Sequence, residues 1–309
     1  MRRPSPAGIE ESGKATFPRE HARRRGTLRA RVPTAGVPAS EGEAALMERV
    51  LMLTLEATGC AAEARLNGMP VLALGPAGGR ACVAVHEYTL AGRNQLGLAI
   101  GGGGDGGAPQ PRVATAAVAA RVRLVLVRQG QAPEDERSRE LAVLDWACAA
   151  GASYESPALR SSEVELPVNF QRWRWLDAPP LALTPAVQRR VLEFIQQMAL
   201  ELGRGNPEPW LAAARLRFEE LALAYQRPPA EAVQRFREHL QSLYVAQALK
   251  IIPPTADELV LRPLVDGRLL EALTPLGGPV LRTQNAAPLA NHAWSARMAM
   301  VEDKIYVLR

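Results

Sequence analysis

The sequence predicts an α+β protein in which an antiparallel β-sandwich is followed by three helices and a curved antiparallel, cone-like sheet. Three observations predict this class. Apolar residues alternate with a period of two up to about residue 176, repeat at helical spacing from residue 184, and alternate again from residue 259. Strands grouped apart from helices are typical of α+β folds. We therefore expect a disordered basic tail at 1–46, a β-sandwich domain at 47–178 and an α+β domain at 179–309.

Length and charge agree with two folded domains and a separate tail. The chain has 309 residues, and domains usually contain about 100–200. Its net charge is +5, but residues 1–45 alone carry nine Lys or Arg against five acids, so the rest is nearly neutral. A nucleic-acid-binding domain carries its positive charge on a folded face. The charge pattern therefore argues against nucleic-acid binding except through the tail.

The first 46 residues have no apolar period and are rich in Arg, Pro, Gly and Ala, which is typical of disorder. We interpret the tail as a solvated segment. The alternative is that translation starts at Met47 and that the assigned start lies too far upstream. A basic arm for nucleic acid or lipid, or an organelle-type address, is the functional alternative. The tail lacks the apolar stretch of a secretory signal, and no run has the 18 apolar residues of a membrane helix. We expect a cytoplasmic protein without membrane contact.

The three cysteines are spaced too widely for a zinc site or a redox pair. An odd number without a framework is typical of a reducing compartment. Cys60 and Cys82 would pair only in an exported protein. The cysteines therefore agree with a cytoplasmic location.

The sandwich is predicted from short alternating runs separated by turns. Asn67-Gly68 lies between two apolar runs and predicts a tight hairpin, because both of its positions accept positive φ. Gly101–Gly107 predicts a loop. Residues 139–148 fit a helix or a strand, and the surrounding strands favour a strand. Seven or so strands suggest a β-sandwich, with the main runs at 51–55, 69–72, 81–86, 96–100, 113–128 and 163–176.

The helical part is bounded by recognisable start and stop residues. Thr184 is expected to cap the first helix, with Pro185 at its first position, and Gly203 is expected to end it. Two further helices are expected from Asn206 and from Pro228, each with one apolar stripe toward the core. The final strands include an Asp266-Gly267 hairpin and an alternating run at 294–300, which turns and returns as 305–309.

Two stretches resemble known families. Residues 65–70 and 85–96 resemble the "LNG … eYl-x-G-x-N-x-L" pattern of jelly-roll accessory domains in bacterial enzymes. The order of elements after residue 179, ending in 296–309, is similar to the nuclear-transport-factor-like α+β cone. Together the two halves resemble two-domain proteins of proteobacteria. Neither resemblance implies a particular catalytic residue.

No motif in the sequence carries catalysis or metal binding. Gly101, Gly103 and Gly106 satisfy G-x-G-x-x-G, but no helix follows to point its N-terminus at a phosphate, so we interpret them as a loop. None of the four histidines has another His or Cys at metal-ligand spacing. We therefore expect no metal, no cofactor and no catalytic residue.

The expected cavity between the helices and the sheet would be lined by polar residues suited to acid–base chemistry. We select five candidate binding residues there, and core packing or a solvated surface is the favoured alternative for each: Tyr225, Tyr244, Asp257, His292 and Trp294.

Arg172-Trp173-Arg174-Trp175 is the most unusual local pattern. On a strand, both tryptophans would lie on one face and both arginines on the other. Exposed, Trp173 and Trp175 would form a stacking platform for a sugar ring or a base. The favoured interpretation is that they fill the core near the domain junction, because the linker at 177–180 follows directly.

Three hypotheses for function follow. The leading one is a non-enzymatic binding protein, an adaptor or immunity-type scaffold whose partner is another protein. The second is an enzyme or binder that takes a small apolar molecule into the cone cavity. The third is a carbohydrate-binding module, which requires Trp173 or Trp175 to be exposed.

Overall fold

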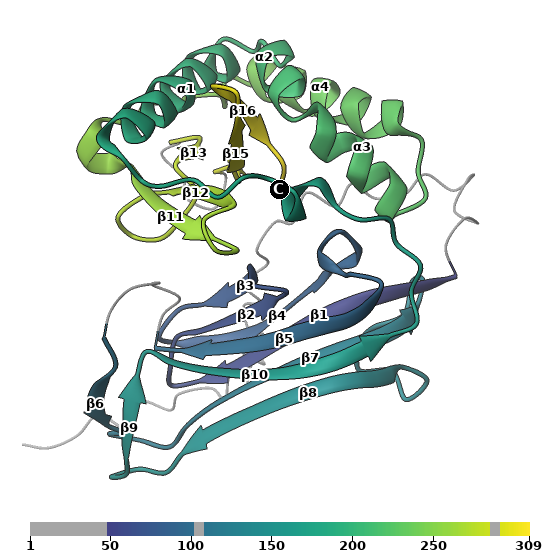
Figure 1. Ribbon diagram of the computed structural model, residues 1–309, viewed down its shortest axis with the longest axis vertical. Helices are drawn as coiled ribbons and strands as arrows, with labels where there is room; N and C mark the ends of the chain where they lie inside the picture. Colours follow the sequence, from purple (N-terminus) through teal and green to yellow (C-terminus); the bar gives the residue numbers. More distant parts are fainter. Residues whose placement is uncertain (1–47, 102–107, 285–290) are drawn as a thin grey trace, which may run out of the picture. The chain divides into compact units, whose positions relative to one another are not determined.

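The first part of the chain folds into two four-stranded antiparallel sheets and a short two-stranded ribbon (Figure 1). The computed structural model describes residues 48–101, 108–284 and 291–309. The strands are β1 (Arg49–Thr58), β2 (Ala62–Leu66), β3 (Met69–Leu74), β4 (Gly78–Ala84), β5 (Gly92–Ile100), β6 (Gln110–Val113), β7 (Val118–Arg128), β8 (Arg139–Cys148), β9 (Ser153–Ser156) and β10 (Ala158–Leu166). The sheet orders are β4-β1-β7-β8 and β10-β5-β2-β3, and β6 pairs with β9.

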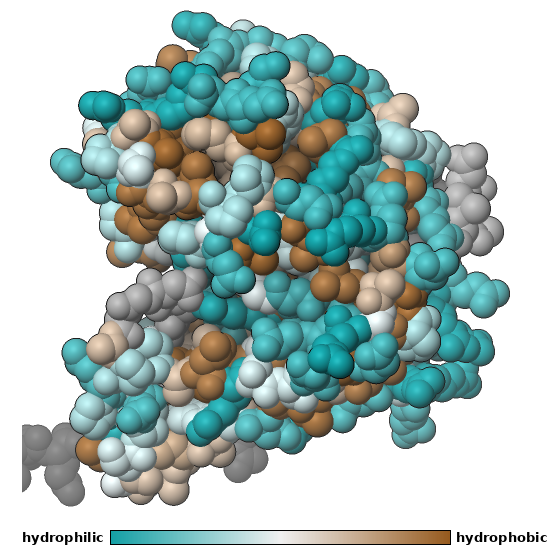
Figure 2. All heavy atoms as spheres, in the orientation of Figure 1, coloured by the Kyte–Doolittle hydropathy of each residue, from teal (hydrophilic) through white to brown (hydrophobic). Residues whose placement is uncertain are grey.

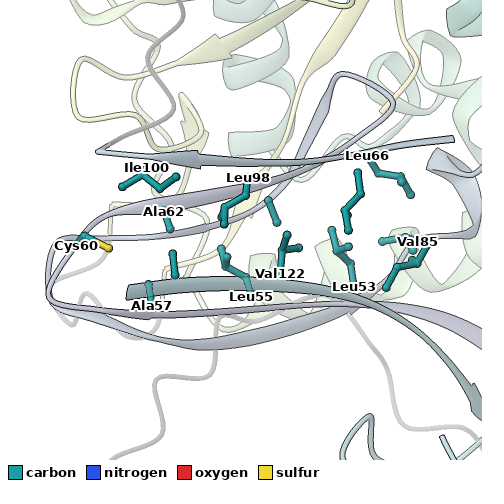
Figure 3. Close-up of a cluster of buried hydrophobic side chains, with 14 of the residues drawn as sticks. Leu53, Leu55, Ala57, Cys60, Ala62, Leu66, Val85, Leu98, Ile100 and Val122 are labelled. Carbon is teal, nitrogen blue, oxygen red and sulfur yellow. The ribbon is translucent and has the colours of Figure 1, made fainter. Parts of the chain in front are cut away.

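One hydrophobic core is built from the facing sides of these two sheets (Figure 3). Leu53 and Leu55 point inward from β1 because alternate side chains of a strand share one face. They pack with Val122 of β7 and with Leu98 and Ile100 of β5, and all five are fully buried. Each such side chain contributes about 1.5–3 kcal/mol of hydrophobic stabilisation. The alternating pattern of the sequence thus predicted the core-facing residues correctly.

The Asn67-Gly68 hairpin is confirmed and does more than turn the chain. Asn67 and Gly68 both have positive φ, +53° and +78°, between β2 and β3. The Asn67 side-chain amide donates 2.8 Å hydrogen bonds to the carbonyl oxygen of Tyr88 and to Oδ1 of Asn94. The hairpin therefore fixes the segment before β5. That segment is a short 3₁₀ helix, η1 (His86–Tyr88), so the prediction that His86 lies on a strand is wrong.

The predicted last strand at 163–176 is largely wrong. β10 ends at Leu166, because Pro167 follows and cannot donate to a strand ladder. Residues 167–173 have no regular structure, and η2 (Arg174–Leu176) is a single 3₁₀ turn. Trp173 and Trp175 therefore do not alternate along a strand.

Four helices follow, one more than expected: α1 (Pro185–Gly203), α2 (Glu208–Ala213), α3 (Arg215–Ala224) and α4 (Pro229–Val245). The Thr184 hydroxyl accepts a hydrogen bond from the Val187 N–H, which confirms the predicted cap, and the helix ends at Gly203. The expected second helix is broken at Ala214, whose φ and ψ of −96° and 9° leave the helical region. No Gly or Pro marks this break in the sequence.

The final sheet is antiparallel and packs against the helices. Its strands, in order across the sheet, are β11 (Val260–Leu264), β12 (Leu269–Leu273), β15 (Arg297–Val301) and β16 (Lys304–Val307). The predicted Asp266-Gly267 hairpin joins β11 to β12, and both of its residues have positive φ. Val191, Ile195, Trp210 and Met298 belong to the core between the helices and this sheet. A separate two-stranded sheet pairs β13 (Leu281–Arg282) with β14 (Ala293–Trp294).

A third hydrophobic cluster joins the strand-rich and helix-containing parts. Met69 of β3, Trp173 and Trp175 pack with Ala224 of α3 and Leu269 of β12. All described residues belong to one compact unit. The chain is therefore an α+β protein with mostly antiparallel sheets, whereas the domain boundary between 178 and 179 stays a prediction.

Hydrophilic residues cover most of the face in Figure 2, and hydrophobic residues gather over β11 to β13. No described helix is long and apolar enough to cross a membrane. Cys60, Cys82 and Cys148 are free thiols. The predicted tail at 1–46 and the predicted glycine loop from residue 102 to 107 lie outside the described residues.

Candidate functional site

Trp173 and Trp175, predicted as a stacking platform or as core, are core residues. Both are 0% exposed. The Trp173 indole N–H donates a 2.7 Å hydrogen bond to the Thr89 carbonyl, and the Arg309 guanidinium lies 5.6 Å from the Trp173 ring centroid. The platform interpretation is wrong, because a sugar or base can stack only on an exposed face.

The Tyr225 side chain is held by contacts within the protein. Its hydroxyl donates a 2.5 Å hydrogen bond to Oε2 of Glu87, and its ring stacks on His86 with centroids 5.2 Å apart. Burial, together with the neighbouring Glu87 charge, raises the pKa of Tyr225 far above its usual range. Tyr225 is therefore a hydrogen-bond donor within a packed cluster.

The other predicted candidates lie apart from Tyr225. Tyr244 is 51% exposed near the end of α4, and Asp257 is exposed in η3 (Ala256–Glu258). Trp294 packs at the edge of the core between the helices and the sheet. His292 lies beside His239, which is not among the sequence-predicted candidates. The contacts of the described residues thus do not assemble these five residues into one site.

Instead, charged residues form a network where the two parts of the chain meet. Its first half centres on Arg262 of β11, whose guanidinium lies 2.8 Å from Oε2 of Glu63 on β2 and 2.5 Å from Oε2 of Glu271 on β12. Arg297 of β15 donates from Nε to Oε1 of Glu271 at 2.8 Å. Burial alone would raise the pKa of Glu271, but Arg297 and Arg262 overcome it and lower that pKa. This half ties β2 to the final sheet.

The second half centres on Arg309. Arg309 Nη1 lies 2.6 Å from Oε2 of Glu220 on α3, and Nη2 donates to the Glu87 carbonyl at 2.9 Å. The other Glu220 oxygen accepts from the backbone N–H of Arg174 at 2.7 Å. Burial raises the pKa of the Glu87 carboxyl, although Tyr225 and Arg309 both act to lower it. The two halves meet where Arg297 Nη1 donates to the Tyr88 hydroxyl at 3.2 Å.

This network is suited to holding the chain together. A carboxylate with a raised pKa is a common mark of a catalytic site, but Glu87 accepts from Tyr225 and both Glu220 oxygens are occupied. The sequence did not reveal the network, because Arg262 and Glu63 are 199 residues apart and Arg309 and Glu87 are 222 apart. Among the described residues, no group of three or more His, Cys, Asp or Glu is placed to hold a metal ion.

An open groove of about 530 Å³ lies at the opposite side of the strand-rich part, between β8, β9 and β10. Trp146 of β8 and Tyr154 of β9 line it, with their rings in edge-to-face contact at 5.2 Å between centroids. Leu159 and Arg160 of β10 complete its wall. Leu159 is 60% exposed, which is unusual for a large apolar side chain on a strand. Polar surface predominates in the lining, and these apolar side chains supply the smaller part of the contact area.

The groove lining contains two charged residues, Glu155 of β9 and Arg160 of β10. In β10, Ala158 and Val164 pack against the core. Arg160 belongs to the same alternating set of residues, but its side chain is exposed. Among the described residues, no hydrogen bond or ion pair reaches the Arg160 side chain, whose backbone pairs with β5. An exposed guanidinium in the lining of a groove that also holds two aromatic rings is suited to binding a carboxylate.

Comparisons with protein-family models, with curated proteins and with solved structures gave no match. The jelly-roll and cone resemblances therefore stay predictions.

Proposed function

We propose that this chain is a non-enzymatic scaffold that binds another protein, and that the groove between β8 and β10 receives an extended, acidic segment of that partner. We also interpret the two first sheets as a β-sandwich and the last part as a cone-like domain packed against it. An adaptor or immunity-type role would follow from such a scaffold.

The unpaired Arg160 in the groove is the observation that carries this proposal. β8 and β10 are each the last strand of their sheet, so each has one backbone edge without a neighbour among the described strands. Edge strands recruit extended peptides through main-chain hydrogen bonds, while pockets select the side chains. Trp146, Tyr154 and Leu159 would hold apolar side chains, and Arg160 would pair with an acidic one.

Two observations weigh against the enzyme alternative. Glu87 and Tyr225, whose pKa values are both raised, already bind one another. Trp210, Phe218 and Met298 pack into the core between the helices and the final sheet, where the small-molecule cavity was expected. The burial of Trp173 and Trp175 weighs against carbohydrate binding through these two rings.

The test is capture of the partner by the full chain from a lysate of its source cells, with chemical crosslinking to identify the bound segment. Leu159→Asp and Arg160→Glu change the groove, and Leu223→Asp is the matched control because Leu223 is 55% exposed on α3. We expect one protein partner that is lost by about tenfold or more with both groove variants and retained by the control. Equal capture by all three variants, or retention of a small molecule without a protein, would contradict the proposal.

A further inference from the structure

His239 and His292 are 53 residues apart in the sequence but lie side by side in the fold. Their ring centroids are 5.0 Å apart and their ring planes meet at 65°. His239 lies on α4 and His292 directly before β14. This pair plays no part in the charged network or in the groove between β8 and β10.

Both residues are held on rigid backbone. The His292 N–H donates a 2.8 Å hydrogen bond to the Thr283 hydroxyl, and the Thr283 N–H donates to the His292 carbonyl at 2.8 Å. Thr283 itself is fully buried. α4 is anchored in the core by Leu240 and Leu243, next to His239. A binding site is more precise when such elements position its side chains.

The rings themselves remain accessible. His239 is exposed and His292 is half-buried. Rotation about the terminal side-chain torsion of histidine has broad preferences, so the ring nitrogens can turn toward a common point at low cost. Because metal–nitrogen bonds measure about 2.0–2.1 Å, two imidazoles on one tetrahedral ion have centroids roughly 5 Å apart. The observed centroid separation of 5.0 Å is close to this value, so the two rings would need to move little to bind one ion.

We propose that His239 and His292 bind one divalent transition-metal ion of the type that prefers imidazole, such as Zn²⁺ or Cu²⁺, with water in the remaining positions. Neutral imidazoles are needed, since a protonated ring has no lone pair to donate. The charged groups on the same helix have partners: Glu231 pairs with Arg235, Arg237 pairs with Glu208, and Glu238 accepts a hydrogen bond from Gln234.

The test is titration of the full chain, without a histidine tag, with Zn²⁺ by calorimetry and with Cu²⁺ by electron paramagnetic resonance. We expect one ion per chain and two nitrogen ligands on Cu²⁺. His239→Gln and His292→Gln should each weaken binding by about tenfold or more and remove one nitrogen signal. His21→Gln is the control, because His21 lies outside the described residues and His86 already uses both ring nitrogens.

Unchanged binding in both variants, or no ion retained by the wild-type chain at equimolar metal, would overturn the proposal. Circular dichroism checks that the variants fold. If His292→Gln is unfolded, the exposed His239→Gln decides the outcome alone. The result is independent of partner capture, because neither histidine lies in the groove.

Discussion

Arg309 and Glu220 form an ion pair of 2.6 Å in which both side chains are only 1% exposed. Arg309 lies at the end of the final sheet, Glu220 lies on α3, and the same guanidinium reaches the Glu87 carbonyl before β5. Taking two charges out of water is costly, and such a pair is stable only when further hydrogen bonds satisfy it. The pair thus marks the point where three distant segments are fixed together.

Glu220→Gln is expected to destabilise the fold strongly. The change leaves the Arg309 charge buried without its partner, which costs about 3–5 kcal/mol in comparable pairs. Glu219→Gln is the matched control, because Glu219 pairs with Arg174 and Arg215 at the surface, where such pairs contribute about 0–1 kcal/mol. Urea unfolding followed by circular dichroism measures both. Similar midpoints for the two variants would contradict the importance of the buried pair.

Trp173→Phe tests the junction between the two parts. The variant removes the indole N–H that Thr89 accepts and leaves that carbonyl unpaired in the core, at a cost of about 1–3 kcal/mol. Trp146→Phe, in the open groove, should cost less than about 1 kcal/mol, because the Trp146 side chain is only partly buried. Thermal unfolding should show one transition in the wild-type chain and a lower midpoint for Trp173→Phe alone. Two separate wild-type transitions would argue against a shared junction.

His86 should make stability depend on pH. Its Nε2 accepts a 2.8 Å hydrogen bond from the Leu51 N–H, and Nδ1 lies 3.1 Å from the Ala224 carbonyl, so the ring is neutral. Burial lowers its folded-state pKa below 6.5, despite the opposing effect of the Ala224 carbonyl. The unfolded chain therefore binds a proton that the folded chain does not, and stability falls as the pH drops below about 6.5.

The measurement compares urea midpoints of the wild-type chain and His86→Gln between pH 7.5 and pH 5.5. The wild-type chain should lose more stability over this range than the variant. Glu87 acts in the opposite direction. Because its pKa is raised in the folded chain, the folded state holds a proton that the unfolded state has lost, so its contribution to stability decreases as the pH rises toward the folded pKa. Equal pH dependence in both proteins would show that His86 is not the responsible group.

Gly78 is required by a close approach of two strands. A Cβ at Gly78 would lie 2.2 Å from the Ala57 carbonyl oxygen, and its φ is +71°. Gly151 has a similar φ of +79° but nothing within 4 Å of the corresponding position. Both alanine variants should lose about 1–2 kcal/mol of folding stability, because a residue with a Cβ disfavours the left-handed backbone. Gly78→Ala should therefore unfold at a clearly lower temperature than Gly151→Ala, and equal midpoints would contradict the predicted clash.

Local sequence patterns predicted most of the helices and strands, but they did not predict which distant residues contact one another. Alternation found the inward face of β1, and turn chemistry found the Asn67-Gly68 hairpin, because both depend on neighbouring residues. The strand predicted at 163–176 failed at Pro167, whose missing N–H ends the ladder. The charged network and the His239–His292 pair join residues from separate elements, and a single sequence does not show which elements meet.

The central claim is that the groove between β8 and β10 binds a partner protein. The most direct measurement places a photo-crosslinking amino acid at Leu159, and in a second chain at Leu223, and irradiates each in its source cells. Crosslinks from position 159 to one extended, acidic segment of a single protein, with none from 223, are the predicted result. The same crosslinks from both positions, or none from 159, would contradict the account.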